Sequence, residues 1–362
     1  MKYFPLILIL SSISALAVKR DKTGKIATLR RVCLITLFLF FIFLAVSALS
    51  LLIGPSRIDA FFLLDRFLSG WGEGNIDLFS MEKTILFSIR MPRIIFAGIV
   101  GAALALAGVV FQGLLRNPLA DPYILGISGG SAVGAIIAII AGMSIVPFGI
   151  PGSAFLGALS TIILVYGIAG TKKELHSATL LLAGVIVNAF FSAVIMFLIS
   201  TAGGKNIHSV MFWLMGDLSL VGWSEIIPTG IFLTVGFIVI YSYSRHLNLI
   251  IAGEETALQL GVNVEKTKKI LLLAASIVTG AAVSVSGIIG FVGLVIPHIM
   301  RMLLGSDHRL LLPSSVLFGG SFLIVADAIA RTVIAPAELP VGVITALCGA
   351  PYFIYLLRRK VV

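Results

Sequence analysis

The side chains that could carry out chemistry are few and scattered in this sequence. The G-x-x-x-x-G-K-[ST] loop, which cradles nucleotide phosphates with backbone amides, does not occur. His-x-x-x-His, Cys-x-x-Cys and His-Glu patterns, which bring metal ligands together, do not occur either. We therefore expect no catalytic residue, no metal site and no cofactor in this chain. The five histidines lie near the ends of apolar runs and are expected at interfaces rather than as ligands: His176, His208, His246, His298 and His308.

Acidic residues are almost absent from the apolar runs, with Asp327 as the main exception. Ion-coupled carriers usually place ionisable groups at mid-membrane depth, so this scarcity disfavours an ion-coupled secondary carrier. Such a carrier stays an alternative, because backbone carbonyls also bind Na⁺ in transporters. The two cysteines, Cys33 and Cys348, lie far apart inside apolar runs and are expected to be small apolar fillers.

The elements that must position these residues are membrane-spanning helices. Apolar types make up 59% of the 362 residues, charged types make up 12%, and the mean hydropathy is +1.13. Apolar runs of about 17–25 residues recur, each long enough to cross ~30 Å of hydrocarbon as a helix. The predicted fold class is an all-α polytopic membrane protein of about ten spans. These spans are expected at 32–53, 91–115, 124–142, 152–170, 178–201, 224–244, 270–287, 288–304, 310–330 and 340–357.

Most of the 26 Lys and Arg residues fall in alternate short loops. Cytoplasmic loops carry such an excess, so we place the segment before residue 32, the loop 252–269 and the C-terminus in the cytoplasm. This distribution accounts for the net charge of +10 without nucleic acid as a partner. The expected location is the cytoplasmic membrane.

Residues 1–31 form a predicted N-terminal extension, an apolar segment followed by a basic stretch. The opening sequence MKYFPLILILSSISALA resembles a signal peptide with an Ala-x-Ala ending. Cleavage there would place the basic stretch KRDKTGKIATLRR outside, against the charge distribution. An uncleaved apolar segment and an upstream mis-set start are therefore favoured over a true signal.

A short charged insert, 252–269, separates the sixth and seventh spans and reads AGEETALQLGVNVEKTKK. An acidic first turn is followed by a small apolar face and a glycine at the C′ position: Glu254, Glu255, Ala257, Leu258, Leu260 and Gly261. A two-turn helix is not stable alone in water and needs a partner to pack against. We expect a docking helix for a cytoplasmic protein, with a solvated connecting loop as the alternative.

Two segments, 101–115 and 280–295, share a Gly-Ala-Ala-x4-Gly core, and each is soon followed or closed by a proline. Five spans separate their starts, so the copies would run in opposite directions, as in the inverted repeats of transporters. Chance similarity is the alternative, because small residues at these spacings also serve close helix packing. Pro118 is expected to end the second span, and Pro297 to leave the eighth span short or broken.

The insert contains Glu255-x-Ala257-x3-Gly261, which resembles the E-A-A-x3-G core of the loop by which ABC importer permeases contact their ATPase. Other stretches look, in order, like the type II permeases for ferric siderophores, haem and vitamin B12. They are RMPR (90–93), NPLADPYILGISGG (117–130), LLLAGV (180–185), MFWLMGDL (211–218), GFVGLVIPHIMR (290–301), DHRLLLP (307–313), ADAIAR (326–331) and AELPVGVITALCGAP (337–351). The resemblance covers about residues 32–360 as one ten-span permease domain.

This resemblance implies a permease that pairs with a second copy of itself and with two cytoplasmic ATPase subunits, which bind ATP and Mg²⁺. An external binding protein would deliver the cargo, and the pathway would lie between the two permease copies. The implied cargo is a bulky metal chelate; we expect a ferric siderophore, with haem or cobalamin as alternatives. Because the ATPase hydrolyses ATP, this chain is not expected to be an enzyme.

On the cytoplasmic side, the resemblance assigns two groups of residues. Contact with the ATPase is implied for Glu254, Glu255, Ala257, Gln259, Leu260 and Gly261. An inner gate is implied for Asn117, Leu119, His176 and Ser177. His176 departs from the small hydroxyl residues that the family favours there.

On the outer side, the resemblance assigns two more groups. Contact with carboxylates of the binding protein is implied for Arg90, Arg93 and Arg331, with lipid-headgroup anchoring as the alternative. A helix lining the outer vestibule is implied by Met211, Phe212, Trp213 and Met215. By composition alone, its aromatic residues also fit an interfacial belt.

Overall fold

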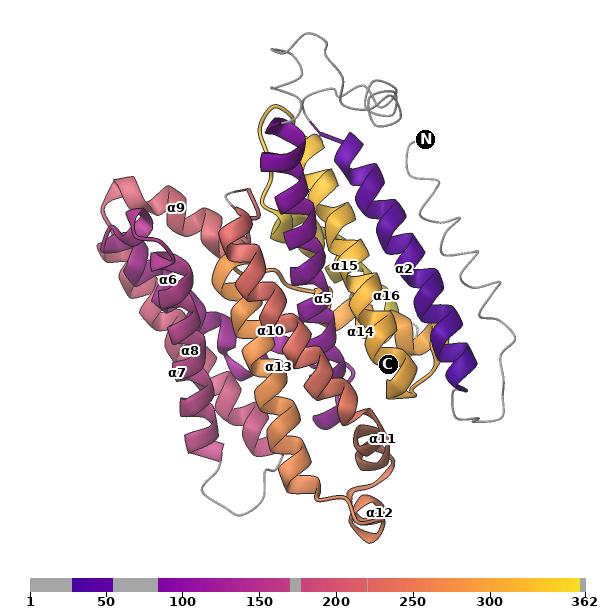
Figure 1. Ribbon diagram of the computed structural model, residues 1–362. Coiled ribbons are helices and arrows are strands. Elements are labelled where there is room, and N and C mark those ends of the chain that lie inside the picture. Colours follow the sequence, from indigo (N-terminus) through magenta and orange to yellow (C-terminus); the bar gives the residue numbers. More distant parts are fainter. Residues whose placement is uncertain (1–27, 55–83, 170–176, 220, 359–362) are drawn as a thin grey trace, which may run out of the picture.

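The computed structural model describes residues 28–54, 84–169, 177–219 and 221–358. Within these ranges every regular element is a helix, which confirms the predicted all-α class (Figure 1). Most of the N-terminal extension predicted at 1–31 lies outside the described residues.

Within the described residues, ten apolar helices form the bundle, one for each predicted span. Seven are long enough to cross a membrane: α2 Leu29–Leu52, α5 Met91–Leu114, α7 Gly149–Ala169, α8 Ser177–Thr201, α10 Trp223–Ser242, α13 Val264–Ser286 and α15 His308–Thr332. Three are shorter: α6 Ile127–Ile140, α14 Val292–Leu304 and α16 Val341–Arg358. A π-helical turn, Ile85–Arg90, leads into α5.

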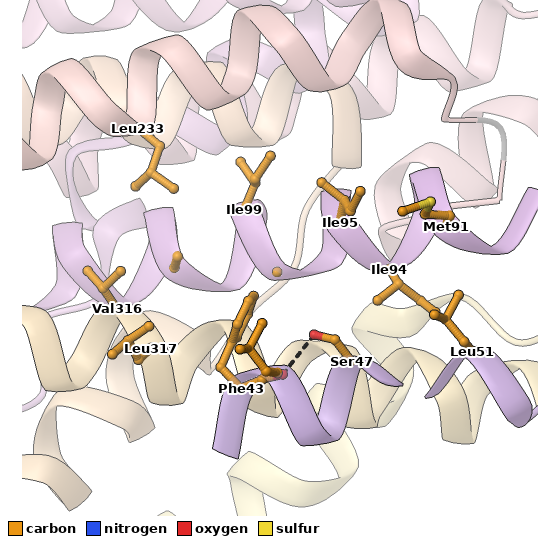
Figure 2. Close-up of a pocket in the computed structure, with 13 residues that line it drawn as sticks. Phe43, Ser47, Leu51, Met91, Ile94, Ile95, Ile99, Leu233, Val316 and Leu317 are labelled. Atoms are coloured by element: carbon orange, nitrogen blue, oxygen red, sulfur yellow. Dashed lines mark hydrogen bonds between the residues drawn. The ribbon is translucent and has the colours of Figure 1, made fainter. Parts of the chain in front are cut away.

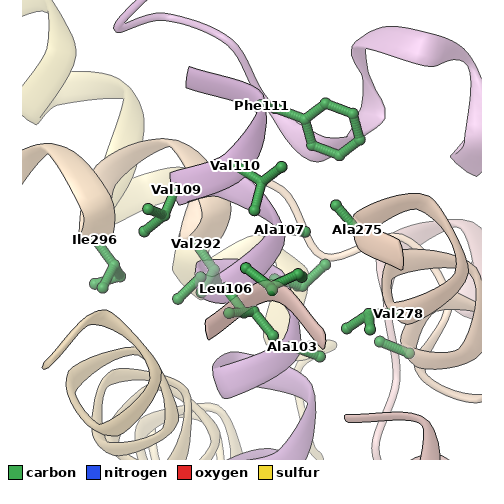
Figure 3. Close-up of a cluster of buried hydrophobic side chains, with 14 of the residues drawn as sticks. Ala103, Leu106, Ala107, Val109, Val110, Phe111, Ala275, Val278, Val292 and Ile296 are labelled. Atoms are coloured by element: carbon green, nitrogen blue, oxygen red, sulfur yellow. The ribbon is translucent and has the colours of Figure 1, made fainter. Parts of the chain in front are cut away.

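α5 is the central helix, and almost its whole length is buried. Its many alanines and glycines let neighbouring backbones approach closely. A side chain at Gly108 would collide with the Gly293 carbonyl, and one at Gly101 with the Gly319 carbonyl. Figure 3 shows buried apolar side chains of α5, such as Leu106 and Val109, together with those of α13 and α14. Such contacts hold membrane bundles together, because lipid supplies no hydrophobic drive between helices.

The bundle has two different ends (Figure 1). α11, Ser244–Ala252, and α12, Glu254–Gln259, lie at one end, and α9, Gly204–Met215, lies at the other. The described bases divide between the ends as the orientation predicts. Arg116, Arg245, Lys266, Lys268 and Lys269 lie towards the α12 end, and Arg90, Arg93 and Arg331 towards the α9 end.

The end of α5 corrects the prediction made for Pro118. Arg116 has a left-handed backbone with φ of +49°. Its N–H donates to the Gly113 carbonyl at 3.3 Å, and the Asn117 N–H donates to the Gln112 carbonyl at 3.2 Å. These two bonds form a Schellman ending. α5 therefore ends before Pro118, and backbone hydrogen bonds form this ending.

α14 is short, as predicted for the span that contains Pro297, and the helix continues through this residue without a break. Proline removes the N–H that would bond to the Gly293 carbonyl. The Gln112 amide of α5 donates to that carbonyl at 3.3 Å and to the Leu294 carbonyl at 3.0 Å. Arg301 donates to Gln112 Oε1 at 3.1 Å and so orients the amide.

The two Gly-Ala-Ala segments have different local structures. Residues 101–115 lie in α5 and its C-terminal cap, whereas 280–295 cover the end of α13, the non-helical link 287–291 and the start of α14. The segments therefore do not match helix for helix, and the inverted repeat stays a prediction.

Candidate functional site

The charged insert contains the short helix that the sequence predicts, α12. It ends at the predicted glycine: Gly261 has φ of +83°, and the N–H groups of Gly261 and Val262 donate to the Leu258 and Ala257 carbonyls at 2.9 Å. Ala257 is fully buried, whereas Leu258 and Leu260 are 59% and 63% exposed. The helix thus anchors itself through one small side chain and presents two leucines outward. Docking of an ATPase on these leucines stays a prediction.

The two acidic residues in the first turn of α12 have different surroundings. Glu255 is exposed, and its carboxylate has no ion pair with any described residue. Glu254 lies between two bases: its Oε2 is 2.6 Å from Lys268 Nζ on α13, and its Oε1 is 3.5 Å from Arg116 Nη2 beyond α5. Arg116 Nη2 also donates to the Ile250 carbonyl of α11 at 3.0 Å. The sequence predicted a favourable helix dipole and, through the resemblance, ATPase contact for Glu254. It did not predict the pairs with Lys268 and Arg116, because these two residues lie in other elements.

The loop between α5 and α6 holds two of the predicted gate residues. Asn117 Oδ1 accepts the Leu119 N–H at 2.9 Å, so this side chain shapes its own turn, and Leu119 is exposed. Asp121 accepts the Tyr123 N–H at 2.9 Å and caps the 3₁₀ turn Pro122–Leu125. Burial raises the pKa of Asp121 to about 6, although this hydrogen bond lowers it.

The second predicted gate loop is only partly described. His176 lies outside the described residues, and Ser177 is described only as the first residue of α8. The structure therefore does not test whether these two residues meet Asn117 and Leu119, and the inner gate stays a prediction.

The three outer arginines are buried, with Arg90, Arg93 and Arg331 only 3%, 6% and 3% exposed. Asp327 lies between two of them: its Oδ1 is 2.8 Å from Arg93 Nε, and its Oδ2 is 3.0 Å from Arg331 Nε. Arg93 Nη1 also lies 2.6 Å from Glu338 Oε2. We call Arg93, Asp327, Arg331 and Glu338 the outer cluster.

The outer arginines also hold the end of α2. Arg331 donates to Ser50 Oγ at 2.8 Å and to the Ile53 carbonyl at 3.2 Å, and Arg90 donates to the Leu51 carbonyl at 2.7 Å. The sequence placed these three arginines together at one end of the bundle, as the structure does, but on an exposed face. In the structure their charged groups serve contacts within the chain, so their contact with a binding protein stays a prediction.

The predicted vestibule residues Met211, Phe212, Trp213 and Met215 form the second half of α9. Phe212 stacks on His208, with 4.4 Å between ring centroids. A side chain at Gly287 would collide with the Trp213 carbonyl, so this end of α9 lies directly against the link 287–291. α9 therefore lies at the end of the bundle opposite α12. Its outer location and its place along a transport pathway stay predictions.

An apolar groove of about 390 Å³ lies between α2, α5, α10 and α15 (Figure 2). Its walls are aliphatic and aromatic side chains, among them Phe43, Ile95 and Leu233. The hydroxyl of Ser47 is already bonded to the Phe43 carbonyl at 2.8 Å. A small-molecule site needs a few free polar groups to orient its ligand. This groove supplies none from its lining residues, and we do not assign the cargo to it.

The metal-binding residue types do not gather within the described residues, where no group of three His, Cys, Asp or Glu side chains could hold an ion. Cys33 and Cys348 are free thiols on the exposed surface of the bundle, so the expectation that they fill the core is wrong.

The described residues form ten apolar helices, with the buried α5 at the centre of the bundle and the short helix α12 at one end. This arrangement defines a multi-pass α-helical membrane protein with a permease fold. Residues 37–359 match the FecCD transport family, and the chain belongs to that family.

Relatives of known name support this placement. The chain is 48% identical over 278 residues to the cobalamin import system permease protein BtuC of Halobacterium salinarum, covering 77% of this chain and 74% of that protein. It is 41% identical to the hemin transport system permease protein HmuU of Yersinia pestis, over 88% of this chain and 95% of that protein. A solved structure, described as an inward-facing conformation of a candidate metal-chelate type ABC transporter, has a TM-score of 0.79 and 32% identity, over 90% of this chain and 99% of that one.

Proposed function

We propose that this chain is the permease subunit of an ABC importer for a metal tetrapyrrole, with cobalamin as the first candidate cargo and haem as the second. The observation that carries the proposal is the 48% identity with a permease named for cobalamin import. The relative named for hemin transport handles a planar metal macrocycle as well. Neither relative is named for a ferric siderophore, the cargo expected from the sequence, so that cargo becomes the third candidate.

The proposed assembly contains two copies of this chain, two ATPase subunits that bind ATP and Mg²⁺, and an external binding protein. The ATPase docks on α12, whose exposed Leu258 and Leu260 lie at the end with more Lys and Arg. The binding protein docks at the opposite end, near α9. This orientation places the C-terminus in the cytoplasm.

An ion-coupled secondary carrier is the second candidate function, and Asp327, the main acidic residue inside the apolar runs, is the side chain best suited to take the ion. Asp327 is fully buried, and its two oxygens pair with Arg93 and Arg331. Two guanidinium groups already surround this carboxylate, which leaves no place for a transported cation. The ABC importer is therefore the favoured function.

Uptake by the reconstituted complex tests the proposal. The chain is purified with candidate ATPase and binding-protein subunits from the same organism, reconstituted into vesicles, and offered cobalamin, haem and a ferric hydroxamate siderophore separately. We expect cobalamin to accumulate only when ATP is hydrolysed, and to do so after the proton and sodium gradients are collapsed. Uptake driven by an ion gradient without ATP would favour the carrier. ATP-driven uptake of the siderophore alone would refute the tetrapyrrole assignment.

A further inference from the structure

We propose that Glu254 is a positioning residue that joins α12 to the end of α5, so that a movement of α12 is passed to the loop 117–119. Its role differs from that of Leu258 and Leu260, which face outward from the same helix. The inference rests on the proposed function only for its transport consequence, because the link itself is a property of this chain alone.

The stronger half of the link is the pair between Glu254 and Lys268. The Lys268 side chain is 6% exposed, and its ammonium group lies 2.6 Å from Glu254 Oε2. Glu265 Oε1, one turn away on α13, lies farther from it at 3.9 Å. A buried charge needs a counter-charge within contact distance, so Lys268 holds the first turn of α12 on α13.

The other half of the link runs through Arg116. Its Nη2 lies 3.5 Å from Glu254 Oε1 and 3.0 Å from the Ile250 carbonyl. Arg116 is the C′ residue of α5, a left-handed position that glycine usually occupies because it has no Cβ. An arginine here accepts backbone strain and supplies a side chain that reaches both α11 and α12.

Arg116 lies next to the loop 117–119, so its contact with Glu254 connects α12 to that loop. Arg116 directly precedes Asn117, whose side chain shapes the turn that presents Leu119. A shift of α12 therefore moves the Glu254 carboxylate that pairs with Arg116. Because Arg116 is one peptide bond from the turn, the movement is passed to it. Sequence spacing alone gave no sign of this contact, since residues 116 and 254 belong to distant segments.

Hydrogen exchange of the full-length permease in lipid nanodiscs tests the link without ATP, cargo or partners. We expect Glu254→Gln to speed amide exchange about tenfold both in α12 and in residues 115–121, because both segments lose a shared anchor. Lys268→Gln should do the same. Lys269→Gln, an exposed lysine on the same helix, is the matched control and should leave both segments as in the wild type.

Two further variants separate the link from general destabilisation. Glu254→Gln with Lys268→Met removes both charges, so no unpaired lysine remains buried, and the fold should be retained. Arg116→Gly keeps the left-handed end of α5 and removes only the side chain. Both should still speed exchange in 115–121. Faster exchange confined to α12 in all these variants would overturn the inference.

The transport consequence is measured in the reconstituted complex as cargo moved per ATP hydrolysed. We expect this ratio to fall severalfold in Arg116→Gly and to stay at the wild-type value in Lys269→Gln. A wild-type complex that moves no cargo would refute the proposed function and leave the exchange result standing. A wild-type complex that transports, with an unchanged ratio in Arg116→Gly, would refute the inference alone.

Discussion

At the scale of single residues, Asp327 is one carboxylate buried between two arginines. Asp327→Asn would leave Arg93 and Arg331 buried without their shared counter-charge. Breaking a buried pair in this way costs about 3–5 kcal/mol, so we expect a clearly lower thermal unfolding midpoint in detergent. Glu338→Gln is the control, because the Glu338 side chain is 34% exposed and Arg93 keeps Asp327. Equal decreases in the unfolding midpoint of the two variants would contradict the role of Asp327 as the main counter-charge of the two arginines.

From the sequence we predicted that Arg90, Arg93 and Arg331 lie at the same end of the bundle. The sequence did not predict which residues they contact. Arg93 and Asp327 are 234 positions apart, and only the packing of α5 against α15 brings them together. The same holds for Glu254 and Arg116 at the other end. A single sequence shows only which residues are neighbours along the chain. An ion pair between distant segments therefore cannot be recognised from it.

At the scale of elements, the packing of α5 on α14 depends on one amide. Gln112→Leu would remove the donor that satisfies the Gly293 carbonyl beside Pro297. A buried carbonyl left without a partner costs about 1–3 kcal/mol, and we expect thermal unfolding in detergent to show this loss. Pro297→Ala restores an N–H to the same carbonyl. Adding Pro297→Ala to Gln112→Leu should therefore recover part of the loss; strictly additive effects would contradict the contact.

The end of α5 gives a second test at this scale. Because two backbone hydrogen bonds end the helix at Arg116, Pro118→Ala should not let it extend. We expect amide exchange at residues 112–117 to remain at the wild-type rate, within about twofold. Slower exchange at Asn117 and beyond would mean that the proline, and not the Schellman ending, limits the helix.

The spans were predictable from the sequence because hydrocarbon thickness fixes how long an apolar run must be. Their ends were less predictable. The sequence offered proline as the stop for α5, where the structure uses an arginine in a left-handed conformation. It also joined the seventh and eighth spans directly, where residues 287–291 form a link that lies against the end of α9.

At the scale of the whole molecule, the bundle is polarised, with α12 and most of the described bases at one end and α9 with the outer cluster at the other (Figure 1). Composition and charge predicted this polarity, since both follow from the membrane as solvent. The cargo was not predictable in the same way. The ten spans and their motifs fit any of three chelate classes, and the ranking changed only when relatives named for cobalamin and hemin were compared.

This polarity predicts that only the α12 end holds the ATPase. Leu258→Asp with Leu260→Asp would remove both exposed leucines without touching Ala257, which anchors the helix from beneath. Burying one leucine contributes about 1.5–3 kcal/mol, so losing both should weaken ATPase retention by far more than tenfold. Ile145→Asp is the matched control, because Ile145 is equally apolar, is 91% exposed, and lies between α6 and α7 at the opposite end. The measurement is the amount of ATPase that co-purifies with each variant from the same membranes, at equal permease yield. Retention unchanged by the double leucine variant, or lost equally in Ile145→Asp, would contradict docking at α12.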